Sequence, residues 1–149
     1  MEKKIMSVVN ELIETSRDGE KGFSKSAEEI DEPRIKSLFL KRAQNCSTAA
    51  RELEEQLRAL GGRTEEGGSV SGALHRGWVN VKASVTGHDT AAILAETERG
   101  ENYAKKVYGE ALEEELPAEL RQLIERQYRG VIANHDEVRN LRNTYRSKS

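Results

Sequence analysis

Four ionisable residues of this 149-residue sequence have the type and spacing of metal ligands: Glu20, Glu98, Glu101 and His135. Carboxylates and imidazoles projecting from facing helices are the ligands of carboxylate-bound iron and of related divalent cations. Glu101 also shares a helical face with Leu94 and Tyr108, where a carboxylate is costly to bury unless a partner neutralises it. The first question that the sequence raises is therefore what Glu101 contacts.

The hydrophobic pattern predicts the elements that position these residues. Apolar residues recur at helical spacing in four long segments, residues 5–30, 35–60, 94–112 and 120–145. Pro33 and Pro117 suit the first turns of the second and fourth segments, and Gly61 with Gly62 ends the second. Residues 70–85 have the same spacing over a shorter length, which predicts a short fifth helix within a long connection.

The lengths of the connections predict the topology. Short turns make the first and second helices antiparallel, and likewise the third and fourth. The long connection runs back along the bundle, so the second and third helices point the same way. Residues 1–149 are thus expected to form a single all-α domain, a ferritin-like four-helix bundle with one long crossover connection.

Polar residues interrupt the apolar stripe of every helix at a similar height along the bundle, counted at about 1.5 Å per residue. This predicted layer contains the residues Glu20, Arg42, Asn45, Cys46, Glu98, Glu101, Asn134 and His135. Polar groups that meet inside a protein can satisfy one another. One interpretation is a layer of ion pairs and hydrogen bonds, with Arg42 bound to Glu20 or Glu101 and Glu98 bound to His135.

The other interpretation is a metal site, and here the ligand set is incomplete. Di-iron carboxylate bundles carry a Glu-x-x-His motif on two helices, but Ile132 precedes His135 at that spacing and the second helix has no histidine. Arg42 supplies a positive charge that opposes a second cation. A single weakly held metal and a complete two-metal oxidase both stay open beside the ion-pair layer. A redox role for Cys46 also stays open, because Arg42 lies one turn away.

Composition excludes several classes of function. The 24 basic and 26 acidic residues give a net charge of −2, which argues against a nucleic-acid binder. No segment reaches 18 consecutive apolar residues, so no membrane span is expected. The single cysteine needs no oxidising compartment, and no cleavable leader is evident, so we expect a cytoplasmic protein.

Three stretches resemble a family of bacterial proteins: "DGEKGFSKSAEEI", "LHRGWVNVKASVTGHDTAAILAETERGENYAKKVY" and "ANHDEVRNLR". It is an uncharacterised family of four-helix bundles, a domain of unknown function placed within the ferritin-like group. The resemblance covers nearly the whole chain and implies the ferritin-like fold. By analogy with the wider group, it also implies that Glu20, Glu98, Glu101 and His135 stand where metal ligands could remain.

These observations together favour a non-catalytic ferritin-like bundle with a degenerate mid-bundle metal site and a stress-associated or protein-interaction role. No cofactor is expected. The first alternative is a metal-binding protein or a di-iron oxidoreductase, which would use iron or another divalent metal. The second alternative is an assembly protein that forms a homo-oligomer or binds an unknown protein partner.

Overall fold

The computed structural model describes residues 2–62 and 90–147, and nearly all of them are helical. The helices are α1 (Glu2–Glu29), α2 (Pro33–Ala59), α5 (Thr90–Ala111) and α6 (Ala118–Ser147). The described residues contain no strand. The predicted all-α class and the predicted long helices are confirmed, whereas the short helix predicted over residues 70–85 lies outside the described residues.

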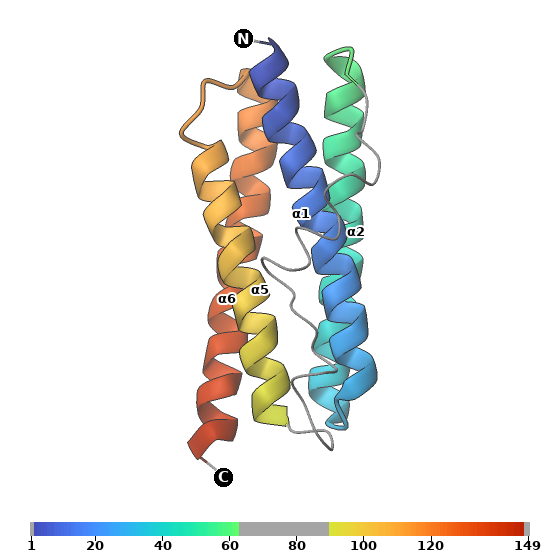
Figure 1. The fold of residues 1–149 in the computed structure, drawn as a ribbon, viewed down its shortest axis with the longest axis vertical. Coiled ribbons are helices and arrows are strands. Elements are labelled where there is room, and N and C mark those ends of the chain that lie inside the picture. Colours follow the sequence, from blue (N-terminus) through green and yellow to red (C-terminus); the bar gives the residue numbers. More distant parts are fainter. Residues whose placement is uncertain (1, 63–89, 148–149) are drawn as a thin grey trace.

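The four helices pack side by side along one long axis (Figure 1). In that view α1 descends, α2 and α5 both ascend, and α6 descends again, so α2 and α5 are parallel as predicted. The helices α1 and α2 pack closely along their length, α5 packs on α6, and α1 packs on α5. The fourth side of the bundle differs, because α2 and α6 contact each other only slightly.

The ends of α2 form as the sequence predicts. Pro33 stands in the first turn, and the side chain of Glu32 accepts a hydrogen bond of 3.3 Å from the amide of Arg34. At the other end Gly61 has a φ of 82°, a conformation that a side chain would strain. The amide of Gly62 donates to the carbonyl of Leu57 at 2.9 Å, which completes a glycine-based helix cap.

The core of the bundle is divided into two apolar clusters. Each of the four helices contributes to both clusters, one built around Phe23 and Phe39 and the other around Leu12 and Leu53. Buried polar residues lie along the helices between the two clusters: Ser16, Thr97, Glu98, Glu101, Gln127, Asn134 and His135. Of the predicted layer, Glu98, Glu101, Asn134 and His135 are buried. The predicted residues Glu20, Arg42 and Asn45 of α1 and α2 are not buried.

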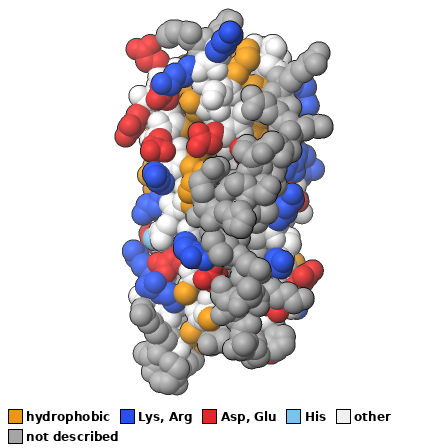
Figure 2. Space-filling model, in the orientation of Figure 1, with side chains coloured by type: hydrophobic (Ala, Val, Ile, Leu, Met, Phe, Trp, Pro, Cys, Tyr) orange, Lys and Arg blue, Asp and Glu red, His pale blue; other side chains and the backbone are white. Residues whose placement is uncertain are grey.

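Acidic and basic side chains are intermixed on the face of the molecule shown in Figure 2. This mixture agrees with the near balance of the 24 basic and 26 acidic residues. Within the described residues, none of the helices combines the length and hydrophobicity needed to cross a lipid bilayer.

Candidate functional site

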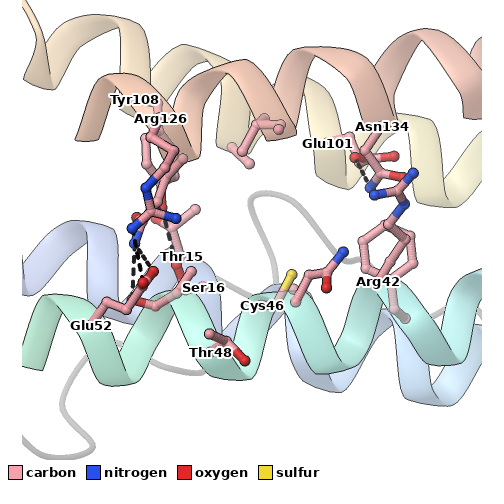
Figure 3. A pocket seen from close by; sticks show the side chains of 18 residues that line it. Thr15, Ser16, Arg42, Cys46, Thr48, Glu52, Glu101, Tyr108, Arg126 and Asn134 are labelled. Atoms are coloured by element: carbon pink, nitrogen blue, oxygen red, sulfur yellow. Dashed lines mark hydrogen bonds and ion pairs between the residues drawn. The ribbon is translucent and has the colours of Figure 1, made fainter. Parts of the chain in front are cut away.

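A cavity of about 290 Å³ lies between α2 and α6, where these helices are least closely packed. All four helices line it, and its polar lining residues include Ser16, Arg42, Cys46, Glu52, Glu101 and Asn134. Figure 3 shows most of the labelled polar side chains at its two ends, with Cys46 between them. One end belongs to the predicted polar layer, and the other contains a network built around Tyr108.

Glu101 is buried at one end of the cavity, with 3% of its surface exposed. Its Oε2 atom accepts a hydrogen bond of 2.5 Å from Nδ2 of Asn134 on the neighbouring helix α6. Burial raises the pKa of Glu101 from 4.5 to about 8, while the Asn134 hydrogen bond and the charge of Arg42 oppose the shift. The nearby carboxylates of Glu137 and Glu98 raise the pKa further.

The predicted partner of Arg42 is wrong. Its Nη2 atom lies 2.8 Å from Oε1 of Glu137 on α6, rather than bonding to Glu20 or Glu101. The Arg42 side chain is 21% exposed and the Glu137 side chain 49% exposed, so this pair spans the opening between α2 and α6. Arg42 faces that opening because α2 has no closely packed neighbour there, and its guanidinium acts on Glu101 only through its charge.

The predicted contact between Glu98 and His135 is confirmed. Their closest atoms, Oε2 and Nε2, are 3.9 Å apart, and both side chains are less than one-tenth exposed. Sequence reasoning did not identify the other partner of Glu98, which is Arg142 on α6, with Nη1 at 2.5 Å from Oε1. Arg142 lies two turns beyond His135 on the same helix, and this spacing was the signal that could have revealed it.

Two residues of the predicted layer, Glu20 and Asn45, take no part in its buried contacts. The carboxylate of Glu20 is 36% exposed and lies 3.2 Å from the guanidinium of Arg17, one turn earlier on α1. Arg17 also binds Glu54 at 3.0 Å and thereby links α1 to α2. Asn45 lines the cavity as an exposed residue. The structure thus places Glu98 beside His135 and Glu101 beside Asn134, and it does not bring Glu20 into contact with any of them.

The donor set of this layer does not fit a pair of metal ions. In the described part of the chain, no three His, Cys, Asp or Glu side chains form a group that could hold a metal ion. Glu98 already binds the guanidinium of Arg142, and Glu101 accepts from an amide. A di-iron carboxylate site needs several carboxylates free to reach the same ions. What the layer can do chemically is balance buried charge and exchange a proton at Glu101.

The other end of the cavity contains a hydrogen-bond network that sequence reasoning missed. The hydroxyl of Tyr108 donates to Oε1 of Gln127 at 2.7 Å and lies 3.3 Å from the hydroxyl of Ser16. Gln127 in turn donates from Nε2 to Oε1 of Glu52 at 3.1 Å. One polar residue from each helix therefore takes part. The available signal was the position of Gln127 among the apolar residues of the α6 stripe.

Cys46 lies between the two ends of the cavity. Gly19 on α1 permits its approach, because a Cβ atom at that position would lie 2.9 Å from the sulfur. Burial raises the pKa of the Cys46 thiol to about 12, and the charges of Glu101 and Glu20 add to the shift. The thiol is therefore protonated at neutral pH, which does not favour the reactive thiolate that a redox role needs.

Residues 4–114 match the family model of a domain of unknown function, DUF2383. The chain belongs to the DUF2383 family. The match includes α1, α2 and α5, and therefore Arg42, Glu98 and Glu101, whereas Asn134 and His135 lie beyond the matched residues. A comparison with curated protein sequences gives no match.

The bundle of this DUF2383 protein is similar to the structure of a mutant of Dps1 from Mycobacterium smegmatis. The TM-score is 0.79 at 15% sequence identity, over 93% of this chain and 95% of the other. At this identity the similarity establishes the fold alone, which is that of a ferritin-like four-helix bundle. The fold and the family resemblance predicted from the sequence are both confirmed.

Proposed function

We propose that this DUF2383 protein is a non-catalytic ferritin-like bundle that acts by binding, with internal charge pairs at the positions where related bundles could hold a metal pair. The observation that carries the proposal is the state of Glu98. Its two oxygens lie 2.5 Å from Arg142 and 3.9 Å from His135, so a guanidinium already balances the carboxylate charge that a metal ion would otherwise balance.

Ferrous iron added in air tests the proposal. A di-iron carboxylate centre would couple oxidation of the iron to consumption of oxygen. We expect the wild-type protein to consume oxygen no faster than buffer containing the same iron, and Arg142→Met to behave in the same way. Rapid oxygen consumption by the wild type, abolished in both Glu101→Gln and His135→Ala, would contradict the proposal and favour the oxidoreductase.

A single divalent metal held by Glu98 and His135 is the second candidate. The proximity of an imidazole nitrogen and a carboxylate oxygen, 3.9 Å apart, favours it. Arg142 opposes it, because its guanidinium bonds to the same carboxylate. Removing that charge in Arg142→Met should strengthen metal binding if this candidate is correct, and Arg139→Met on the exposed surface of α6 is the matched control.

The binding partner, the oligomeric state and the location of the protein are further parts of this proposal. A stress-associated or protein-interaction role, a homo-oligomer and a cytoplasmic location all agree with a ferritin-like bundle whose surface carries mixed charge. Light scattering at several protein concentrations distinguishes the assembly role from the others. An oligomer that persists on dilution would favour assembly, and a monomer would favour binding of a different protein or of a small molecule.

A further inference from the structure

The Glu101 end of the cavity contains buried polar atoms that no described residue satisfies. Oε1 of Glu101, Oδ1 of Asn134 and Nε of Arg42 expose almost no surface and have no hydrogen-bond partner among the described residues. A ligand would reach them when the Arg42 side chain, which is 21% exposed, shifts toward solvent. All three side chains line the cavity and lie close together in Figure 3. An unsatisfied buried polar atom is unfavourable, so three at one place indicate where a bound molecule could supply the missing hydrogen bonds.

Other hydrogen bonds of the same side chains hold these three unsatisfied atoms in position. Asn134 binds the other oxygen of Glu101, and Glu137 binds a terminal nitrogen of Arg42. The two open oxygens accept hydrogen bonds, and the open nitrogen donates one. When Glu101 is ionised, a molecule that satisfies all three must therefore present two N–H donors and one acceptor from the same small group.

A primary carboxamide has this pattern, with two N–H donors beside one carbonyl oxygen. It also suits either protonation state of Glu101. If Glu101 is ionised, its Oε1 accepts from the ligand N–H. If Glu101 is neutral, its hydroxyl donates to the ligand carbonyl together with Nε of Arg42. An ammonium group would leave the Arg42 donor open and meet its charge, and a carboxylate would leave Oδ1 of Asn134 open.

The cavity beyond these atoms suits an apolar group. Phe23, Ala49, Ala104 and Val131 contribute apolar surface to the lining, and the volume of about 290 Å³ exceeds that of a benzene ring. The charge of Arg42 is already balanced by Glu137. We infer that this cavity binds a small neutral molecule with an apolar, ring-sized body and a primary carboxamide that contacts Glu101, Asn134 and Arg42.

Three ligands of matched size test the inference: benzamide, benzylamine and benzoate. Titration of the isotope-labelled protein, followed by NMR, gives the affinity and the site of each. We expect benzamide to bind at least about tenfold more tightly than the two charged ligands, because only it pairs with all three atoms. Equal or weaker binding of benzamide, or shifts confined to residues outside the cavity, would overturn the inference.

Two pairs of variants examine the contacts and the cavity separately. Glu101→Leu should weaken benzamide binding by about tenfold, whereas Glu101→Gln, which keeps an oxygen acceptor, should stay within about threefold. Gly130 lines the cavity, and a Cβ atom there meets nothing within 4 Å, so the ring of Gly130→Phe has room to fold into the cavity and should weaken benzamide binding. Ala133→Phe, on an exposed part of α6 outside the cavity lining, is its control and should bind normally.

If Glu101→Leu does not fold, Gly130→Phe and its control Ala133→Phe still test the inference, because neither of these two substitutions removes a buried polar group. Unchanged affinity in Gly130→Phe would contradict the inference. Carboxamide binding goes beyond the proposed function, and different experiments would contradict the two proposals. Iron chemistry at Glu98 and His135 would overturn the proposed function, whereas only the carboxamide titration decides the occupant of the cavity.

Discussion

Asn134 on α6 donates a hydrogen bond to Glu101 on α5, and both side chains are more than nine-tenths buried. This contact is what Glu101 has in place of the arginine partner expected from the sequence. A neutral amide stabilises an ionised carboxylate less than a guanidinium does. Burial raises the pKa of Glu101 to about 8, because the Asn134 hydrogen bond and the charge of Arg42 offset only part of the cost of burying the charge.

The stability of the protein should fall as pH rises through the range in which Glu101 titrates. The native state keeps the Glu101 proton up to about pH 8, whereas the unfolded chain releases it near pH 4.5. Between these values the unfolded state binds fewer protons, so Glu101 lowers the free energy of unfolding as pH rises, by an amount on the order of a few kcal/mol. Denaturant unfolding at several pH values measures the change.

The variant Glu101→Gln isolates this effect. The glutamine side chain does not ionise, so the variant should lie within about 1 kcal/mol of the wild type at pH 5 and be the more stable protein at pH 9. Glu110→Gln, on the exposed side of α5, is the matched control and should differ little from the wild type at either pH. A Glu101→Gln variant that is equally destabilised at both pH values would contradict this explanation.

The cost of removing Arg42 should depend on pH. Its pair with half-exposed Glu137 is worth about 1 kcal/mol or less, so Arg42→Ala should be mild at pH 6. At pH 9 the cost should be larger, because Arg42 then no longer favours the ionised form of Glu101. Arg126→Ala, which removes the ion pair with Glu52 at the other end of the cavity, should cost the same at both pH values.

Arg142 should contribute more to stability than any exposed arginine of α6. Its removal in Arg142→Met leaves the buried carboxylate of Glu98 without its cation, at a cost of about 3 kcal/mol. Combining it with Glu98→Gln should recover much of the loss in a double-mutant cycle. Arg139→Met removes an ion pair whose two side chains are nearly half exposed, and should cost less than about 0.5 kcal/mol.

The hydroxyl of Tyr108 should stabilise the far end of the cavity. Tyr108→Phe leaves the oxygen of Gln127 without a donor, which predicts a loss of about 1–2 kcal/mol in the free energy of unfolding. Tyr128→Phe is a suitable control, because that ring stacks on Tyr108 with centroids 6.5 Å apart and keeps its packing. Equal effects of the two substitutions would show that the network contributes nothing beyond ring packing.

The fold could be predicted because its signals are local. Apolar residues at helical spacing fix the buried face of each helix, as with Leu12 and Phe23 on α1. Pro33 and the glycine pair after Ala59 fix the ends of α2. The order of short and long connections then leaves few ways to arrange four helices.

The candidate site could be predicted only in part, because height along a bundle does not determine direction around a helix. Counting residues placed Glu98 level with His135, and both stripes face inward, so that contact was confirmed. Arg42 was placed at the correct level, but its long side chain extends across the loosely packed α2–α6 side to Glu137. That loose packing depends on the contacts of all four helices, and no single stripe encodes it.

The number of metal ions bound per chain tests the central claim most directly. Protein purified without chelator or affinity metal is dialysed against ferrous iron under anaerobic conditions, and the bound iron is measured by elemental analysis. If charge pairs occupy the layer, the wild type should bind well under one iron per chain, with no change in Glu101→Gln. Two irons per chain, lost in both Glu101→Gln and His135→Ala, would contradict the account.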